Sequence, residues 1–442
     1  MIADAPAAEL TAVYRKVTLR LLPFLGLCYL TAYLDRVNVG FAKLQMAQAL
    51  RLSDVSYGLG AGIFFIGYFL FEVPSNLILH RIGARGWLAR IMISWAVISA
   101  ASAALAPIHA RFGADAAAYA FYAIRFTLGM AEAGFFPGIL LYLTYWFPRS
   151  RRSLAVGQLI VAQPIAFVLG APLSGLILST YQGLAGLQAW QWMYILEALP
   201  AALLGLVLLV RLDEGIAEAR WLTGRERDLL ARALADERPA GSTTDLAGLA
   251  GNGAVWLLAG AYFLLVLGAY GLNFWLPSIL KTAGVSRELT VGLLTALPYA
   301  VGVAVMLMLA HRTHDARRAR IRSAWMCALA GAGLAISAHF AGNLWLMMVG
   351  MTLGVSGYLT ANALFWSLPG EPLEGRALAV GLAAVNALGN LGGFAGPYLV
   401  GALLGPASEP TTALFALAAI LACAGLALRL GTFRRQSSPE QA

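Results

Sequence analysis

Long apolar stretches recur along almost the whole chain, and they constrain its fold more than any other feature. About 20 apolar residues cross a bilayer as a helix, and these stretches are too long and too apolar for strands. Only 12% of the 442 residues are charged, compared with about 25% in a typical soluble domain. We therefore predict an all-α integral membrane protein with twelve transmembrane helices, at about residues 18–41, 57–79, 87–107, 117–146, 154–178, 191–211, 254–279, 289–310, 321–340, 343–366, 377–403 and 411–430.

Lysines and arginines are distributed unevenly among the loops, and alternate loops carry most of them. One set of loops holds only Lys43, Arg51, Arg111, Lys281 and Arg287, whereas the termini and the other loops hold nearly all the rest. Cytoplasmic loops carry an excess of basic residues, so we expect both termini to be cytoplasmic. This bias also accounts for the net charge of +9, so we expect no nucleic-acid partner.

The longest polar gap, 213–252, divides the predicted helices into two groups of six. We expect a cytoplasmic N-terminus (1–17), a first six-helix half (18–211), a cytoplasmic linker (212–252), a second half (253–430) and a cytoplasmic tail (431–442). Glycine-proline clusters at 170–175 and 392–397 occupy corresponding places in the two halves. Two repeated halves with a site between them at mid-membrane are typical of secondary transporters.

Four charged residues interrupt the apolar segments of the first half: Asp35, Arg36, Arg125 and Glu132. Translocon scales put such a charge at a helix centre at about 2.5–3.5 kcal/mol, so these residues must pair, face a wet cavity or act in transport. Arg125 and Glu132 are two helical turns apart and share a face. Asp35 and Arg36 are adjacent, so they point about 100° apart on a helix and cannot stack on each other.

The remaining reactive residue types form no pattern typical of catalysis. Cys28, Cys327 and Cys423 are isolated within apolar segments. The histidines have no metal-ligand spacing, and no phosphate loop or nucleophile triad is present. We expect neither an enzyme nor a metal or organic cofactor, and a proton or a sodium ion would serve as the coupling ion.

Several motifs together resemble those of the major facilitator superfamily, in particular its anion:cation symporter branch. They are Leu34-Asp35-Arg36-Val-Asn38-Val-Gly40-Phe41, Phe71-Glu-Val-Pro74-Ser-Asn76, the segment 125–138, and Trp192-Met-Tyr-Ile-Leu-Glu197-Ala-Leu-Pro200. The nearest group is that of bacterial tartrate, phthalate, nicotinate and hydroxyphenylacetate transporters. The resemblance implies a carrier in the bacterial inner membrane, working as a monomer surrounded by lipid.

The resemblance also assigns roles to the charged residues. Arg36 would bind the substrate carboxylate, since a guanidinium holds a carboxylate bidentately. Asp35 and Glu132 would carry protons, and Arg125 would pair with Glu132. Tyr33, Tyr68 and Gln163 would line the site in the first half. The four charges sum to zero, so an incoming anion unbalances them and a proton restores the balance. The alternative is that they form buried ion pairs that lock helices together.

Fewer polar residues mark a site in the second half. The candidates for substrate contact are Tyr270, Asn273, Asn362, Trp366, Asn386 and Asn390, with inter-helix hydrogen bonding as the equally weighted alternative. Asn386 and Asn390 are four residues apart and share a helix face. Glu197 lies within the sixth predicted helix, and we interpret it as a helix-packing residue in preference to a proton carrier.

We predict a proton-coupled symporter for a small organic carboxylate, either a tartrate-like dicarboxylate or an aromatic or pyridine monocarboxylate. Two membrane arginines favour an anion. Three alternatives remain at this stage: an exchanger or efflux carrier of the same fold, a sodium-coupled anion symporter, and a membrane sensor that transports nothing.

Overall fold

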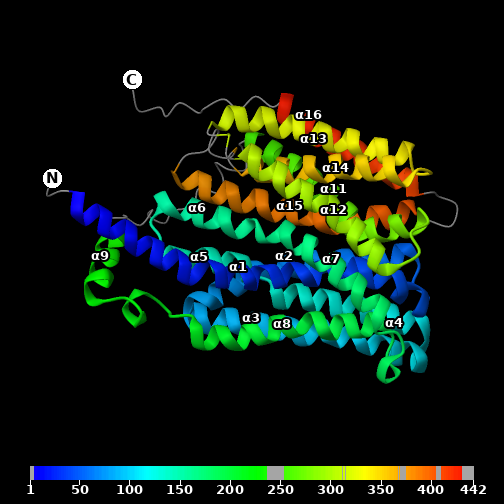
Figure 1. Ribbon diagram of the computed structural model, residues 1–442, viewed down its shortest axis with the longest axis horizontal. Coiled ribbons are helices and arrows are strands. Elements are labelled where there is room, and N and C mark those ends of the chain that lie inside the picture. The colour runs from blue at the N-terminus through cyan, green and yellow to red at the C-terminus, as the bar shows by residue number, and fades with distance from the viewer. Residues whose placement is uncertain are drawn as a thin grey trace.

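The computed structural model describes residues 4–235, 253–310, 312–313, 315–366, 368, 375–404 and 410–430, and all regular structure in these ranges is helical. Figure 1 shows most of the helices running along the long axis of the molecule. Their bounds are α1 Asp4–Ala49, α2 Asp54–Ile82, α3 Ala84–Ala101, α4 Leu105–Glu132, α5 Phe135–Thr144, α6 Arg149–Ile160, α7 Ala162–Thr180, α8 Ala189–Arg211, α9 Gly224–Ala235, α11 Gly253–Thr282, α12 Glu288–Ala310, α13 Ala316–His339, α14 Leu344–Phe365, α15 Gly375–Leu403 and α16 Pro410–Leu430.

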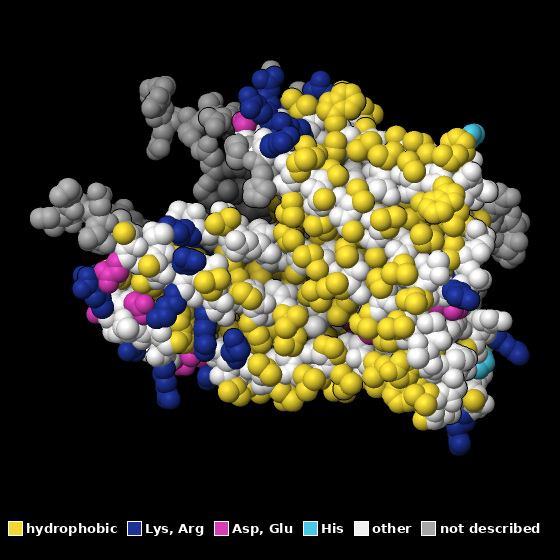
Figure 2. Space-filling view, viewed as in Figure 1, with side chains coloured by type: hydrophobic (Ala, Val, Ile, Leu, Met, Phe, Trp, Pro, Cys, Tyr) yellow, Lys and Arg dark blue, Asp and Glu magenta, His cyan; other side chains and the backbone are white. Residues whose placement is uncertain are grey.

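Each of the twelve predicted spans falls on helix in the structure. Among the described residues, ten helical runs are long and apolar enough to cross a membrane, judged by length and composition. One of these runs, 84–144, holds two predicted spans, and α15 holds the predicted span 377–403. Figure 2 shows hydrophobic side chains over the middle of the molecule, with Lys and Arg gathered mainly at the end where α1 begins. The all-α membrane fold predicted from the sequence is confirmed.

Two predicted spans are broken rather than continuous, which corrects the sequence-based prediction. The span 117–146 is divided between α4 and α5 at Gly134, whose φ of 85° is left-handed and favours glycine. The span 154–178 is divided between α6 and α7 at Val161. Pro164 follows three residues later and supplies no backbone N–H for the preceding turn, which accounts for the interruption there.

The helices form two groups that pack chiefly within themselves. We call α1–α8 the N-terminal half and α11–α16 the C-terminal half; they lie in the lower and upper parts of Figure 1. The two halves meet through three helix pairs: α7 with α12, α2 with α15, and α1 with α11. These pairs position residues of α1 and α11 at the centre of the molecule, between the halves.

Close backbone contacts between the halves concentrate toward one end of the bundle. On α2, a Cβ atom at Gly58 would lie 2.5 Å from the Pro397 carbonyl oxygen of α15, so only glycine fits there. On α7, a Cβ at Gly175 would lie 2.5 Å from the Glu288 carbonyl oxygen at the start of α12. By contrast Val73, which lies four turns along α2 from Gly58, is 66% exposed. The halves are therefore joined at the end where α2 begins and α7 ends.

The helix α9 packs at the opposite end beside the start of α1. Lys16 Nζ lies 2.8 Å from Glu226 Oε2, and Arg20 lies 5.6 Å from the centre of the Trp221 ring. Residues 236–252 of the predicted linker and the predicted tail 431–442 lie outside the described residues. The first part of the linker is thus attached to the N-terminal half.

Candidate functional site

Five charged side chains are buried among the described residues, and all five belong to the N-terminal half. Four of them, Asp35, Arg36, Arg125 and Glu132, are those singled out in the sequence, with exposed fractions between 1% and 9%. The fifth is Glu197 of α8, which is 3% exposed. None of the four charged residues singled out in the sequence faces the lipid. The structure therefore brings them into the interior of the bundle.

Arg36 is the centre of the first polar cluster, and it faces the C-terminal half. Its Nη2 forms an ion pair with Glu132 Oε1 of α4, and its Nη1 donates a hydrogen bond to the Tyr270 hydroxyl of α11 at 3.1 Å. Rings of Tyr33, Phe64 and Tyr68 surround the guanidinium, with centroids 4.6, 5.2 and 5.8 Å from Cζ. The predicted pair between Arg125 and Glu132 is therefore wrong, because Arg36 takes the place of Arg125.

Asp35 lies in a second polar cluster inside the N-terminal half. Ser99 Oγ of α3 donates a hydrogen bond to Asp35 Oδ1, and Asn38 Nδ2 donates to the same oxygen at 3.4 Å. Arg125 of α4 is buried, and its guanidinium carbon lies 5.0 Å from the Phe64 ring centre. Adjacent residues of α1 therefore serve two different environments, as the 100° turn between them requires.

The two buried arginines differ in how many partners their guanidinium groups have. Arg36 has an ion pair, a hydrogen bond and three aromatic neighbours. Arg125 is 1% exposed, and its Nε and Nη2 atoms have no hydrogen-bond partner in the structure. Phe64 lies near both cations, with its ring centre 5.2 Å from Arg36 Cζ and 5.0 Å from Arg125 Cζ.

Two tyrosines and a glutamine of the first half were predicted to line the site, and their contact with substrate stays a prediction. Tyr33 and Tyr68 are buried and face Arg36. Gln163, on the first turn of α7, is half-buried and has no hydrogen bond to Arg36 in the described part of the chain. One turn further, Phe167 stacks on Tyr299 of α12 with ring centroids 4.4 Å apart, so Gln163 lies near the line where the halves meet.

In the C-terminal half the structure separates the predicted residues into two groups. Tyr270 joins the Arg36 cluster directly. Asn273, one turn along α11, accepts hydrogen bonds from the hydroxyls of Tyr299 and Tyr358 at its Oδ1 atom. The alternative of inter-helix hydrogen bonding therefore applies to Asn273.

The other four predicted residues have no ion pair or hydrogen bond to the Arg36 cluster in the described ranges. Asn362, Asn386 and Asn390 are half-buried. Trp366 packs against Tyr262, with ring centroids 4.9 Å apart. These residues lie on α15 and at the end of α14, and their contact with substrate stays a prediction.

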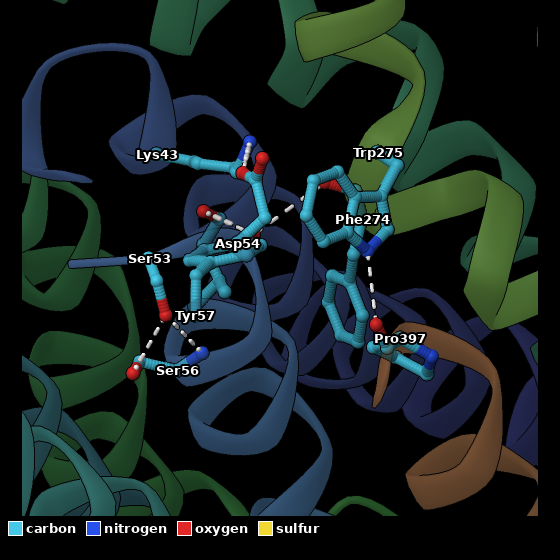
Figure 3. A network of polar contacts seen from close by, with 9 residues as sticks. Lys43, Ser53, Asp54, Ser56, Tyr57, Phe274, Trp275 and Pro397 are labelled. Carbon is cyan, nitrogen blue, oxygen red and sulfur yellow. Dashed lines mark hydrogen bonds and ion pairs between the residues drawn. The ribbon is translucent and has the colours of Figure 1, made fainter. Parts of the chain in front are cut away.

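A third polar network closes the joined end of the molecule (Figure 3). Lys43 of α1 pairs with Asp54 of α2 at 2.8 Å and lies 4.0 Å from the centre of the Trp275 ring of α11. The Tyr57 hydroxyl donates hydrogen bonds to the carbonyl oxygens of Val39 and, across the halves, Phe274. Trp275 Nε1 also donates to the Pro397 carbonyl at 3.2 Å. Sequence reasoning did not identify this network, because its members are ordinary loop-end residues.

Sequence reasoning also missed Ser99 and Phe64, and it placed Glu197 among packing residues. A serine or phenylalanine in an apolar helix carries no distinctive signal. Within the described ranges, no three His, Cys, Asp or Glu side chains group as a metal site. The side chains that meet at the Arg36 cluster supply a guanidinium group, tyrosine hydroxyl groups and a carboxyl group.

Comparison with known proteins identifies the family to which the chain belongs. The sequence profile of the Major Facilitator Superfamily matches residues 25–397. The chain belongs to this superfamily. It is a multi-pass membrane transporter rather than an enzyme.

Several similar proteins are bacterial. A protein of Agrobacterium vitis named as a tartrate transporter is 43% identical over 88% of this chain and 88% of its own length. The metabolite transport protein NicT of Pseudomonas putida is 40% identical over 93% of both chains. A quinolone resistance transporter of Acinetobacter baumannii is 38% identical over 88% of both.

Solved structures of transporters share the fold at low sequence identity. A bacterial homologue of the human lysosomal transporter Spinster superposes with a TM-score of 0.71 at 16% identity, covering 94% of this chain and 97% of that one. The xylose transporter XylE of Escherichia coli gives 0.70 at 14% identity, covering 97% and 98%. The described helices therefore have the arrangement typical of the superfamily.

Proposed function

We propose that this protein carries a small organic carboxylate across the bacterial inner membrane together with protons. The observation that carries the proposal is the buried Arg36–Glu132 ion pair beside Tyr270, at the junction of the halves. A substrate carboxylate binds Arg36 in place of Glu132. Protonation of Glu132 then removes the competing negative charge, so substrate and proton enter the site together.

The aromatic surroundings of Arg36 suit a flat or short substrate. Tyr33, Tyr68 and Tyr270 supply hydroxyl groups, and Phe64 and Phe65 supply apolar faces near them. Hydroxyl groups hydrogen-bond the hydroxyls of a tartrate-like acid, whereas the ring faces stack on a pyridine or benzene ring. The name of the relative from Agrobacterium vitis, a tartrate transporter, supports the first of these two classes.

Alternating access follows from the contacts between the halves. Because basic loops face the cytoplasm, the end with α9 is the cytoplasmic end and the joined end is periplasmic. On this orientation we infer an inward-facing state, in which the network of Lys43, Tyr57 and Trp275 holds the periplasmic end closed. The outward-facing state requires those contacts to separate and the cytoplasmic ends to approach.

Energetics favour coupling to protons. Bringing a monoanion into an interior-negative cell costs roughly 2.3 kcal/mol per 100 mV. One proton per anion cancels that cost, and two protons make the potential assist uptake. Asp35 and Glu132 provide two protonatable groups for the cycle, and sodium stays an alternative to be tested.

The direct test is uptake of radiolabelled tartrate and nicotinate into vesicles containing the purified protein. We expect accumulation when the outside is more acidic than the inside, and its loss when a protonophore removes the gradient. Accumulation that survives the protonophore and requires sodium would replace protons by sodium. Arg36→Ala should abolish binding of the transported acid, and wild-type binding by that variant would contradict the assigned site.

Efflux is the second candidate function, because one relative is named as a quinolone resistance transporter. The same vesicles distinguish it. A carrier that expels a loaded fluoroquinolone in exchange for protons, and accumulates neither carboxylate, would be an efflux pump.

A further inference from the structure

A pocket of about 850 Å³ lies at the joined end of the molecule, and the proposed transport cycle gives it no role. Its wall consists of the ends of α1 and α7, residues of the loop 181–188 and the start of α12, so both halves contribute to it. Gln45 lies nine residues after Arg36 on α1, which is about 14 Å along the helix axis. Most of the polar lining consists of amides and charges, from Gln45, Gln48, Gln182, Gln188, Arg287 and Glu288.

The charge balance at the pocket is positive. Glu288, the first residue of α12, forms an ion pair with Lys281 of α11, with Nζ 2.9 Å from Oε1. The neighbouring Arg287 is exposed, and its side chain has no ion pair or hydrogen bond to another described residue. A guanidinium group without a carboxylate of its own can hold a ligand carboxylate bidentately, so this wall of the pocket favours an anion.

Two glutamines of the loop 181–188 add hydrogen-bond donors to the same pocket. Gln182 Oε1 accepts a hydrogen bond from the backbone N–H of Ala189 at 3.4 Å, and Gln188 Oε1 accepts one from Trp190 Nε1 at 2.6 Å. Because both amide oxygens are engaged at the start of α8, the two amide nitrogens remain to donate. Donors of this kind match the oxygens of a carboxylate.

The wall formed by α1 favours a ligand that carries hydroxyl groups. Gln45 Nε2 donates a hydrogen bond to the Leu178 carbonyl oxygen of α7 at 3.3 Å, whereas Gln45 Oε1 is buried without a partner. Gln48, three residues later, is exposed. A glutamine amide both donates and accepts, as a hydroxyl group does. None of the described residues that line the pocket is aromatic, in contrast to the rings around Arg36.

We propose that this pocket is a second binding site, which takes a polyhydroxylated organic acid such as tartrate from the periplasm. Arg287 and the amide nitrogens of Gln182 and Gln188 hold a carboxylate, and Gln45 and Gln48 hold hydroxyl groups. The inference rests on the proposed function for the orientation of this end and for the choice of an organic acid as the anion.

A ligand in this pocket favours the closed periplasmic end, because the two halves assemble the pocket together. The helices α7 and α12 are in close contact next to it: a Cβ atom at Gly292 would lie 2.4 Å from the Ala171 carbonyl oxygen. Separating these helices would carry Arg287 away from Gln182 and divide the pocket. A ligand shifts a conformational equilibrium toward the state that it binds more tightly. A high external concentration of the acid should therefore slow the return to the outward-facing state.

Protection of a cysteine in the pocket from a membrane-impermeant maleimide tests the binding. The site is marked by Gln48→Cys together with Cys423→Ser, since Cys423 is exposed and the other two native cysteines are buried. We expect tartrate to slow the labelling and nicotinate to slow it much less. Adding R287Q should raise the half-protecting concentration of tartrate at least about tenfold, because a hydrogen bond to a charged group is lost.

Arg111→Cys, at an exposed arginine outside the pocket, is the control for labelling, and its rate should not depend on tartrate. Labelling of Q48C that is equally fast with and without tartrate would overturn the proposal. Protection of Q48C that R287Q leaves unchanged would also overturn it, because tartrate would then act through the Arg36 cluster alone. These measurements do not require transport.

Uptake measurements test the effect of the second site on the cycle. The initial rate of labelled tartrate uptake by the wild type should pass through a maximum and fall at higher external concentration, whereas R287Q should reach a plateau. R111Q is the matched control and should behave like the wild type. If the wild type carries nicotinate instead, external tartrate should lower the maximal rate of nicotinate uptake, and R287Q should remove this inhibition.

The outcomes separate the second site from the proposed function. Wild-type rates that reach a plateau, or nicotinate uptake that tartrate leaves unchanged, would overturn the preference for the closed periplasmic end. Wild-type protein that accumulates neither acid would contradict the proposed function, and the cysteine protection would still decide whether the pocket binds tartrate.

Discussion

Glu132→Gln tests the proposed competition between Glu132 and substrate most sharply. In the structure the Glu132 carboxylate occupies Arg36, and the Tyr270 hydroxyl is a further hydrogen-bond partner of Arg36. Glutamine has nearly the same shape and keeps an acceptor oxygen but has no charge, so it competes less strongly with an anion for Arg36. We expect E132Q to bind the transported carboxylate more tightly than the wild type at a pH where Glu132 is ionised.

The magnitude follows from the contact that substrate must displace. A hydrogen bond to a charged group contributes about 1.5–3 kcal/mol, which corresponds to roughly 10- to 150-fold in affinity. Without bound substrate, E132Q should be less stable than the wild type, because removing one member of a buried ion pair costs about 3–5 kcal/mol. Bound substrate should recover part of this loss, so the thermal shift on binding should be larger in E132Q.

Calorimetric titration with tartrate or nicotinate at two pH values measures both effects. Wild-type affinity should weaken as pH rises, since ionised Glu132 competes, and E132Q affinity should depend on pH much less. The exposed substitution Glu218→Gln is the control for a lost negative charge. Binding by E132Q that is weaker than wild type, with the same pH dependence, would show that Glu132 supports substrate instead of competing with it.

Three other predictions concern separate parts of the molecule. Arg36→Lys keeps the charge but loses the planar fork and ring stacking, so affinity for the acid should fall at least about tenfold; an isotherm like wild type would refute the bidentate role. Trp275→Leu removes the ring beside Lys43, a contact of about 0.5–2 kcal/mol, and should raise the outward-open population. Distances between spin labels on the periplasmic ends of α2 and α15 would then lengthen. An unchanged distance distribution would contradict the role of this network in holding the periplasmic end closed. Hydrogen bonds from the Lys16 ammonium lower the pKa of Glu226. The stabilisation of the contact between α9 and α1 is therefore complete above the ordinary glutamate pKa of about 4.3 and is lost as the pH falls below it. Hydrogen exchange in α9 should become faster in that pH range, and constant protection would argue against this pair.

The twelve spans and the buried charges could be predicted from the sequence because lipid makes both conspicuous. A run of apolar residues has few other uses, and a charge within it is costly unless it is paired or hydrated. Asp35, Arg36, Arg125 and Glu132 stood out for this reason. The breaks at Gly134 and Val161 were less visible, since a glycine or a proline is common in membrane helices.

Pairing among the charges could not be derived from spacing. Positions 125 and 132 share a face of α4, but spacing along one helix does not indicate which residue of α1 that face meets. The fold brings Glu132 of α4 to Arg36 of α1. Glu197 posed the same difficulty, because only the fold shows that Ser174 of α7 donates a hydrogen bond to it.

The second half was harder because its polar residues are uncharged. An asparagine in a membrane helix can bind substrate or a neighbouring helix, and its sequence does not distinguish the two. Asn273 is engaged by Tyr299 and Tyr358, whereas Tyr270 reaches across to Arg36.

Proton movement driven by substrate tests the central claim most directly. Vesicles containing the protein are held at zero membrane potential with equal pH on both sides, in weak buffer, and tartrate or nicotinate is added outside. Joint entry of acid and protons predicts that the external medium becomes more alkaline in step with uptake. Uptake of the labelled acid with no change in external pH would contradict the account.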